Sequence, residues 1–503
     1  MERSGNRKWW VLTALAIGLL AVGLDMTILN LALPTLAMEL QARNSELQWF
    51  ANAYTLVFAA ALLPAGLLGD RLGRKKILLL GLLLFGIASI VCAYADTVVA
   101  LIVGRALLGL GAALLVPLSM ALIPVLFAEE ERSKAIGVWV MANAVGIPLG
   151  PIVGGWLLNH YAWGSVFLIN IPFVVVAMAA IGLLLKESRG DVRTRVDYVG
   201  ILLSSIGLIG ITYGVIEAGE LGWNHIGALS TLILGVLLLA GFVWWERRSR
   251  QPLVDLRLFH STAFTWGSVM ATIISFVMFG LLFVLPQYFQ GVEGTDALGA
   301  GLRLLPLVGG LIIGSKIADG LQQKAGAWLT IALGFIILAF SLALGANTTI
   351  TDSYGVVAVW ITLSGLGIGF VLPSAMDLAM SALTAEQSGV GSAFIMSLRN
   401  IGGTIGVAVL GTVLSRSYRD GLDIGGLPET AAEAVQRNVA AGVAVAKQLN
   451  EVSLLEQVRN AFIGGMSHLF WLCCIIAVVG LLLAVLFLRS KKGLNAGAGD
   501  LDM

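Results

Sequence analysis

Residues 9–34 read WWVLTALAIGLLAVGLDMTILNLALP, an apolar run interrupted by a single acidic residue, Asp25. A helix of this length exceeds the roughly 20 residues that are needed to cross the hydrocarbon core of a bilayer. Arg7 and Lys8 precede the run, as basic residues precede a signal peptide core. However, the run is too long for such a core and lacks a small-residue cleavage site. We therefore expect it to be the first membrane span of the mature protein.

The same pattern recurs along the rest of the chain. Apolar residues make up 58% of the 503 residues and charged residues only 12%, whereas a soluble domain carries about 25% charged residues. Polar breaks with Gly and Pro separate the apolar runs, so we expect an all-α polytopic membrane protein. Its fourteen expected spans cover residues 9–34, 48–69, 77–95, 98–118, 135–158, 165–185, 197–218, 226–245, 263–289, 297–318, 327–346, 354–380, 391–413 and 462–488.

Composition and motifs argue against several other classes of protein. The net charge is +1, and no basic stretch alternates with aromatic residues as in nucleic-acid-binding proteins. Cys92, Cys473 and Cys474 lie in apolar runs without metal-ligand spacing. We find no nucleotide-binding Gly-x-x-x-x-Gly-Lys-Ser/Thr loop and no Ser/His/Asp arrangement. We therefore expect neither an enzyme nor a protein with a bound metal or cofactor.

Basic residues predict the orientation, because short cytoplasmic loops are enriched in Lys and Arg. Clusters of these residues follow the second, sixth, eighth and fourteenth spans, at residues 71–76, 186–195, 247–250 and 489–492. The breaks after the third, fifth, seventh and ninth spans contain neither Lys nor Arg. Both termini are therefore expected on the cytoplasmic side.

An internal repeat predicts two related halves. Residues 109–117 read GLGAALLVP and residues 365–373 read GLGIGFVLP. The same offset of 256 residues pairs glycines of the fifth and thirteenth spans, namely Gly146 with Gly402, Gly150 with Gly406 and Gly155 with Gly411. Chance matches are the alternative, since the chain has 61 glycines, but a constant offset over two consecutive spans favours a true repeat.

The repeat divides the chain into three expected parts. Residues 1–190 form one six-helix half, residues 191–250 an inserted transmembrane hairpin, and residues 251–503 the second six-helix half. A long loop, residues 414–461, lies on the outer side, and its stretch 428–459 has the composition of an amphipathic surface helix. Two parallel six-helix halves are the arrangement of major facilitator transporters.

Four motifs carry a family resemblance. Residues 66–76, GLLGDRLGRKK, resemble the major facilitator signature between the second and third spans. Residues 24–34, LDMTILNLALP, are similar to the first-span motif of the fourteen-span drug:proton antiporters. Residues 105–111, RALLGLG, resemble the arginine motif of the fourth span, and residues 146–155, GIPLGPIVGG, the antiporter motif of the fifth. The chain is therefore identified as a member of the major facilitator drug:proton antiporters, and the major facilitator fold is expected.

Asp25 is the first candidate for function. It lies about 24 Å from the inner end of its span, at about 1.5 Å per residue, and an acid at such depth usually faces a cavity or a partner. We hypothesise that Asp25 binds a proton or a cationic substrate, one at a time. The alternative is an acid that is neutralised by a neighbouring helix for structural reasons.

Arg105 lies at a similar depth in the fourth span, and the resemblance implies that it takes part in proton coupling. Our hypothesis is that Arg105 favours the ionised carboxylate of Asp25 in one conformation and withdraws in the other, so that the proton leaves on one side only. A static ion pair, or an arginine bound to backbone carbonyls, is equally compatible with the sequence.

Two further groups of residues follow from the motifs. A conformational latch is implied by the resemblance at Gly66, Asp70, Arg71, Gly73 and Arg74, and a plain cytoplasmic anchor is the alternative. Close helix packing and an antiporter role are expected at Gly146, Pro148, Gly150, Pro151, Gly154 and Gly155, with tight packing alone as the alternative.

Other polar and aromatic residues within the spans are candidates for lining a substrate cavity. Aromatic side chains can form an adaptable wall for cations, although packing or contact with lipid is the more common role of any single one. The cavity candidates are Asn52, Tyr54, Trp139, Asn143, Glu217, Phe276, Phe283, Asp377 and Phe394.

Together these observations predict a proton-coupled antiporter. It would export hydrophobic, cationic drugs, dyes or biocides across a bacterial cytoplasmic (inner) membrane, with protons as the coupling ion and lipid as its surroundings. It would function as a monomer. An exporter of one dedicated substrate, such as a metabolite, siderophore, tetracycline or amino acid, is the alternative, and a non-transporting membrane sensor is a third possibility.

Overall fold

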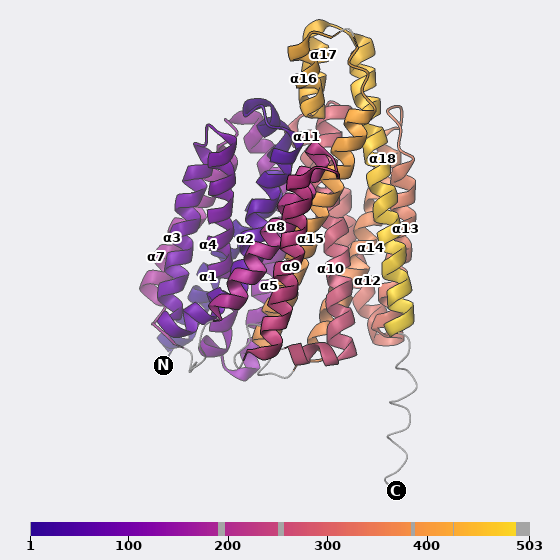
Figure 1. Ribbon diagram of the computed structural model, residues 1–503. Helices are drawn as coiled ribbons and strands as arrows, with labels where there is room; N and C mark the ends of the chain where they lie inside the picture. Colours follow the sequence, from indigo (N-terminus) through magenta and orange to yellow (C-terminus); the bar gives the residue numbers. More distant parts are fainter. Residues whose placement is uncertain (1, 190–196, 250–255, 384–387, 426, 489–503) are drawn as a thin grey trace.

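The computed structural model describes residues 2–189, 197–249, 256–383, 388–425 and 427–488, and within these ranges the chain is helical and has no strand. Long helices run up and down in one bundle (Figure 1). The first half consists of α1 (Glu2–Glu39), α2 (Asn44–Leu72), α3 (Arg74–Ala93), α4 (Val98–Leu126), α5 (Glu129–His160), α6 (Ser165–Leu168) and α7 (Asn170–Leu184).

The break between α6 and α7 has a local cause. Pro172 carries no N–H, so it cannot bond to the carbonyl four residues earlier, and its ring crowds that carbonyl. The helix is accordingly interrupted at Ile169 and resumes at Asn170. Asn170 thus begins α7 in the interior of the bundle, where its side chain is fully buried.

The hairpin of α8 (Tyr198–Leu221) and α9 (Ile226–Arg248) follows the first half. Its two helices pack on each other, and α8 also packs on α2 and on α15 (Ser388–Asp420) of the second half. Thr412 of α15 donates a hydrogen bond to the Val215 carbonyl of α8, at 3.2 Å. The hairpin therefore lies against the line where the two halves meet, as Figure 1 shows.

The second half repeats the helix pairs of the first. It comprises η1 (Leu256–His260), α10 (Thr262–Gln287), η2 (Tyr288–Val292), α11 (Ala297–Arg303), α12 (Leu305–Ala325), α13 (Ala327–Ala346), α14 (Tyr354–Met380), α15, α18 (Val452–Leu483) and η3 (Ala484–Leu488). The pairs α2–α4, α3–α4, α1–α5 and α3–α7 correspond to α12–α14, α13–α14, α10–α15 and α13–α18. This correspondence is what the repeat predicts, with α11 and α12 together matching α2.

The expected loop 414–461 is largely helical. α15 extends to Asp420, α16 (Glu429–Arg437) and α17 (Val439–Leu449) form a cap, and α18 already begins at Val452. The cap rises above the bundle at the end opposite to the start of α1 and the end of α18, which we call the outer end (Figure 1). The single amphipathic helix expected over 428–459 is thus replaced by two short helices and the first part of α18.

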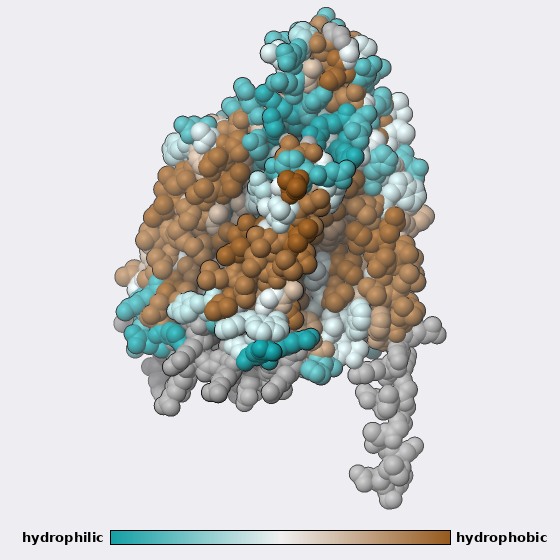
Figure 2. Space-filling view, viewed as in Figure 1, coloured by the Kyte–Doolittle hydropathy of each residue, from teal (hydrophilic) through white to brown (hydrophobic). Residues whose placement is uncertain are grey.

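Twelve helices in the described part of the chain are long and apolar enough to cross a membrane. The twelve do not include α2 and α5, which are 29 and 32 residues long, so the count of fourteen spans stays a prediction. Figure 2 shows a broad hydrophobic belt across the viewed face of the bundle, with hydrophilic residues gathered over the cap at the outer end. A surface of this kind fits a bilayer, because lipid accepts the apolar belt.

The two halves are joined by hydrogen bonds toward the outer end. Asn44 donates to the Gly411 carbonyl at 3.2 Å, and Asn438 of the cap donates to the Ala42 carbonyl at 2.7 Å. Deeper in the bundle, the hydroxyls of Thr55 and Thr404 are 2.8 Å apart. The bundle is therefore closed between the halves at its outer end.

Candidate functional site

The site is centred on a buried ion pair. Arg105 Nη1 of α4 donates to Asp25 Oδ2 of α1 at 2.5 Å. The exposed fraction of the side chain is 2% for Arg105 and 1% for Asp25. Because removing such charges from water is costly, a buried pair persists only when further hydrogen bonds satisfy both groups. The sequence predicted that these residues lie at a similar depth, and the structure places them in contact.

Two residues that the sequence analysis did not single out complete the environment of Asp25. Asn170 Nδ2 of α7 donates to Asp25 Oδ1 at 3.2 Å and to Ser89 Oγ of α3 at 3.2 Å. Both Asn170 and Ser89 are fully buried. Among the described residues, each carboxylate oxygen of Asp25 therefore accepts one hydrogen bond, and both donors come from the first half of the chain.

Arg105 is held by two further contacts with α2. Its Nε donates to the Phe50 carbonyl at 3.1 Å, and its Cζ lies 4.6 Å from the centre of the Tyr54 ring. A guanidinium over an aromatic face is attracted by the ring quadrupole. Gly109 allows this approach, because a Cβ at this position would lie 2.3 Å from the Tyr54 carbonyl oxygen.

The helix that carries Asp25 is positioned by glycines of α5. A Cβ added at Gly146 would lie 2.8 Å from the Gly23 carbonyl carbon, and one at Gly150 would lie 1.9 Å from Thr27 Oγ1. Small residues at a spacing of four allow two helices to approach closely. These contacts flank Asp25 on α1, so the packing of α5 fixes the position of the carboxylate.

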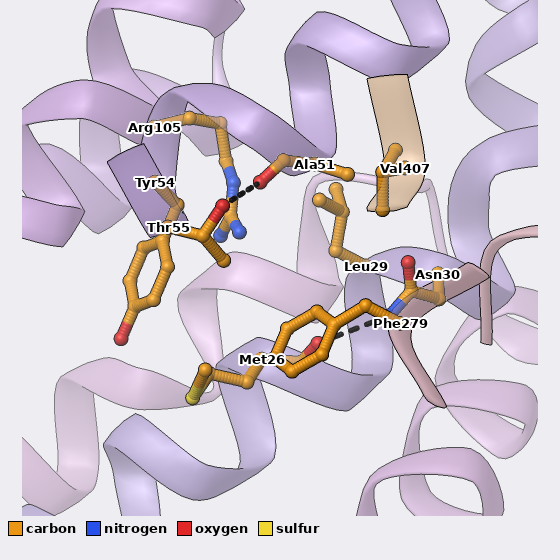
Figure 3. Close-up of a pocket in the computed structure, with 9 residues that line it drawn as sticks. All are labelled: Met26, Leu29, Asn30, Ala51, Tyr54, Thr55, Arg105, Phe279 and Val407. Carbon is orange, nitrogen blue, oxygen red and sulfur yellow. Dashed lines mark hydrogen bonds between the residues drawn. The ribbon is translucent and has the colours of Figure 1, made fainter. Parts of the chain in front are cut away.

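A cavity lies beside the ion pair, between the two halves. Its lining residues come from α1, α2 and α4 on one side and from α10 and α15 on the other, and they are Met26, Leu29, Asn30, Ala51, Tyr54, Thr55, Arg105, Phe279 and Val407. Figure 3 shows Arg105 and Tyr54 at this cavity, together with Phe279 and Val407 of the second half. Arg105 thus contributes to the cavity wall, whereas Asp25 is behind it.

Comparison with known proteins agrees with this architecture. The family model of the Major Facilitator Superfamily matches residues 15–407. The chain belongs to the major facilitator superfamily.

Several members of this superfamily resemble the chain over nearly its full length. The tetracenomycin C resistance and export protein of Streptomyces glaucescens is 32% identical, over 97% of this chain and 93% of the relative. The multidrug efflux pump LfrA of Mycolicibacterium smegmatis is 32% identical, over 92% and 93%. The methyl viologen resistance protein SmvA of Salmonella typhimurium is also 32% identical, over 91% and 93%.

A solved structure shows the same fold. A bacterial homologue of the human lysosomal transporter Spinster, crystallised in an inward-facing and unoccupied conformation, matches with a TM-score of 0.66. The match covers 96% of this chain and 98% of the other, at 16% sequence identity. The major facilitator fold that the sequence predicted is therefore confirmed.

The remaining residues of the antiporter motif connect the halves. Gly154 packs against Ile28 of α1, whereas a Cβ at Gly155 would lie 2.6 Å from Leu298 Cα of α11. The Pro151 carbonyl oxygen would lie 2.3 Å from a Cβ at Gly301. The side chain of Pro148 lies outside the described part of the structure. The motif therefore packs against both the Asp25 helix and the second half.

The major facilitator signature lies at the end of α2 opposite to the cap. Arg74 Nη1 donates to the Ala121 carbonyl at 3.4 Å, and Gly73 adopts a φ of 114° beside the Glu187 carboxylate. Arg71 is half-buried, and a Cβ at Gly66 would meet open space. The side chain of Asp70 lies outside the described residues. The latch role of these residues stays a prediction.

The other cavity candidates lie in varied surroundings, and Tyr54 is the one candidate with a described side chain that lines the cavity described above. Trp139 donates to Ser119 Oγ at 2.8 Å, and Asp377 is exposed and accepts from Gln322 at 2.5 Å. Phe283 is fully buried, Phe276 and Glu217 are half-buried, and Phe394 stacks on Phe264.

Asn52 is fully buried, and neither end of its side-chain amide has a hydrogen-bond partner among the described residues. The side chain of Asn143 is not among those described.

A signal for Asn170 was present in the sequence. It is the one side-chain amide in the expected span 165–185, and a proline follows two residues later. Polar side chains at membrane depth usually find a partner, so this residue could have been listed beside Asp25. Ser89 carries a weaker signal, because a serine in a helix can bond to its own backbone.

Proposed function

We propose that this protein exports hydrophobic, mainly cationic small molecules in exchange for protons. Relatives that are 32% identical over nearly the whole chain are named as resistance, export and efflux proteins. The two halves would rock around the central cavity in an alternating-access cycle. The protein would act as a monomer in a bacterial cytoplasmic (inner) membrane, with both termini in the cytoplasm.

The observation that carries the proposal is the buried Asp25–Arg105 pair beside the cavity. In the ionised pair the two charges cancel, so the wall of the cavity is close to neutral. Arg105 stays charged at any pH that a cell experiences. Protonation of Asp25 would therefore leave an uncompensated positive charge in the wall, next to Tyr54 and the substrate.

This charge can couple the two transported species without direct contact between Asp25 and the substrate. Two like charges about 8 Å apart repel by about 2 kcal/mol at an effective dielectric constant of about 20. Such a repulsion weakens the binding of a cation by roughly 30-fold. A proton that binds Asp25 thus expels a cation, and a bound cation favours release of the proton.

The conformation of the halves fits one stage of this cycle. The outer end is closed by contacts between the halves, such as that of Asn44 with Gly411, while Asp25 is paired with Arg105. In the proposed cycle this is the stage after the proton has left toward the cytoplasm. The neutral wall is then ready to accept a cation from the inner side.

Reconstituted protein tests the proposed function. Purified wild type and Asp25→Asn are placed in liposomes, a pH gradient is imposed, and movement of the lipophilic cation ethidium against its gradient is followed. We expect proton-driven transport by the wild type and none by the variant. Equal proton-driven transport by both would overturn the proposal.

A panel of substrates tests the breadth of export. Cells that lack other pumps and express the protein are exposed to cationic dyes, biocides, tetracycline, siderophores and amino acid analogues. Protection against several unrelated cations is expected. Protection against a single class would support the dedicated exporter instead, and the absence of any transport in liposomes would support a sensor.

A further inference from the structure

We infer that Asn170, with Ser89, is a positioning residue that binds Asp25 in both of its protonation states. This inference rests on the proposed function, in which Asp25 gains and loses a proton. It concerns the gain and loss of a proton at the Asp25–Arg105 pair, and it adds to this pair a third side chain, that of Asn170 in α7.

The hydrogen bonds of Asn170 use only one end of its amide. The Nδ2 group carries two hydrogens and donates both, one to Asp25 and one to Ser89. The Oδ1 atom is buried and has no hydrogen-bond partner among the described residues. A buried acceptor without a partner costs about 1–3 kcal/mol, so its retention beside a titrating acid calls for a reason.

The two ends of a side-chain amide have nearly the same shape but opposite hydrogen-bonding roles. While Asp25 is ionised it can only accept, and the Nδ2 end serves it. Once Asp25 is protonated, its O–H needs an acceptor. A half-turn of the Asn170 amide brings Oδ1 into the place of Nδ2 and supplies this acceptor.

Ser89 can follow the same change. Its hydroxyl accepts from Nδ2 in the structure, and a hydroxyl can equally donate. After the half-turn it would donate to the Oδ1 of Asn170. Asp25, Asn170 and Ser89 would therefore stay linked by hydrogen bonds in both states, and after the half-turn the Nδ2 group would occupy the buried position that Oδ1 has in the structure.

Among the described residues, no ionisable group near Asp25 is placed to supply this acceptor. The ionisable groups that interact with it electrostatically in the described structure are Arg105, Tyr54 and Cys92. Arg105 can only donate, so it offers no acceptor to the O–H of a neutral Asp25. Tyr54 presents its ring to Arg105 and its hydroxyl has no hydrogen-bond partner there. In the described contacts of the carboxylate, Asn170 is the one neutral partner.

This arrangement explains how Arg105 can be released. If protonated Asp25 had only Arg105 beside it, its O–H would be buried without an acceptor, and the neutral state would be disfavoured. Asn170 removes this cost, so the proton can be held inside the first half while the guanidinium turns toward the cavity. The amide thus keeps both stages of the cycle accessible.

The test is the pH profile of ethidium transport in liposomes, for wild type, Asn170→Leu and Asn170→Asp. Leucine keeps the shape but loses both hydrogen-bonding ends. The lost bond to the charged carboxylate outweighs the lost bond to the neutral acid, so Asp25 should bind its proton more tightly. The midpoint of the pH profile should therefore move to higher pH by about one unit, which corresponds to a roughly tenfold change in proton affinity. In Asn170→Asp, an ionised aspartate can accept a hydrogen bond but cannot donate one. The midpoint of the pH profile should therefore move further in the same direction than in Asn170→Leu.

Matched serine variants provide the control. Ser89→Ala should shift the midpoint in the same direction by a smaller amount. Ser341→Ala removes a similarly buried hydroxyl, which lies 3.0 Å from Ser364 Oγ in the second half, and should leave the midpoint unchanged. If Asn170→Leu does not fold, Asn170→Asp and Ser89→Ala carry the test.

The experiments distinguish a wrong proposed function from a wrong role for Asn170. Proton-driven transport by Asp25→Asn would overturn the proposed function itself. If Asp25→Asn is inactive but the folded Asn170 and Ser89 variants keep the wild-type midpoint, only the role of Asn170 is overturned. An equal shift in Ser341→Ala would also overturn it, because the shift would then reflect general loosening of the bundle.

Discussion

The two halves of the molecule share their scaffold but differ at the positions of Asp25, Arg105, Tyr54 and Ser89. Gly146 and Gly150 face Gly23 and Thr27, on either side of Asp25, and their counterparts Gly402 and Gly406 face Thr272 and Phe276, on either side of Ile274. Three further residues of the first half have counterparts in the second half. These are assigned by the offset of 256 residues or by equivalent glycines that contact the same helix position in each half. Arg105 corresponds to Ile361, Tyr54 to Leu307 and Ser89 to Leu342, and all these apolar counterparts are buried.

The difference shows which features the fold requires and which the function requires. Glycine contacts between paired helices recur in both halves, because close helix approach depends on small residues. The polar residues do not recur, so the packing does not need them. A buried ion pair is costly relative to apolar residues of similar volume, and its presence in one half only points to a role in the proposed proton coupling.

The largest expected effect comes from removing the cation of the pair. Arg105→Ala leaves the buried carboxylate of Asp25 without its charged partner, and breaking a buried pair costs about 3–5 kcal/mol. Proton-driven ethidium transport should fall by a factor on the order of 10² or more, and the remaining transport should not respond to pH.

Arg399 of the second half is the matched control. It is half-buried, and its described polar contacts are with Ser275 Oγ at 3.4 Å and Met376 Sδ at 3.9 Å. Arg399→Ala should lower activity less and keep the response to the pH gradient. Loss of pH dependence in Arg399→Ala but not in Arg105→Ala would place proton coupling in the second half and contradict the comparison.

Glycine variants in equivalent positions should give an intermediate effect. Gly150→Ala and Gly406→Ala each place a methyl group against the paired helix, and overpacking of this kind costs about 1–3 kcal/mol. Both should lower the midpoint of thermal unfolding in detergent. Only Gly150→Ala should also displace Asp25 and shift the pH profile of transport, and equal pH profiles for the two variants would show that the packing does not position the acid.

The smallest expected effect concerns the contact between the halves. The Asn52 amide is buried on α2 without a partner among the described residues, on the helix that meets α15 through Thr55 and Thr404. Asn52→Leu should stabilise the packing of α2 by about 1 kcal/mol, the low end of the range for removing an unsatisfied polar group. Thermal stability should rise and the transport rate should fall, whereas a lower stability would indicate that the amide has a partner during the cycle.

Much of the fold could be predicted from the sequence, because apolar length and glycine periodicity are strong signals in a membrane protein. Details with local causes were missed. The break at Ile169 depends on Pro172, and the sequence did not predict that the helix expected over 428–459 divides into α16, α17 and the start of α18. Such features depend on single residues and not on a repeating pattern.

The site could be predicted only in part. Asp25 and Arg105 stand out, because each is a charged residue deep in an apolar run. Ser89 does not stand out, since neutral polar residues occur in many membrane helices, and Asn170 is marked only as the one side-chain amide of its expected span. That the two residues meet at Asp25 depends on how α3 and α7 pack. The sequence also left open whether Asp25 contacts the substrate, a question that depends on the burial of Asp25 behind Arg105.

The central claim is that a proton on Asp25 expels a cation by exposing the charge of Arg105. Equilibrium binding of ethidium to purified protein tests it most directly, with wild type, Asp25→Asn and the double variant Asp25→Asn/Arg105→Leu. An uncharged substrate found in the panel serves as the control, since its binding should not change in Asp25→Asn.

The account predicts that Asp25→Asn, which mimics the protonated state, binds ethidium roughly 30-fold more weakly than the ionised wild type, in line with the repulsion expected at about 8 Å. The double variant, which has neither charge, should recover most of the lost affinity and bind independently of pH. If the double variant binds as weakly as Asp25→Asn, Asp25 itself holds the cation, and the account is contradicted.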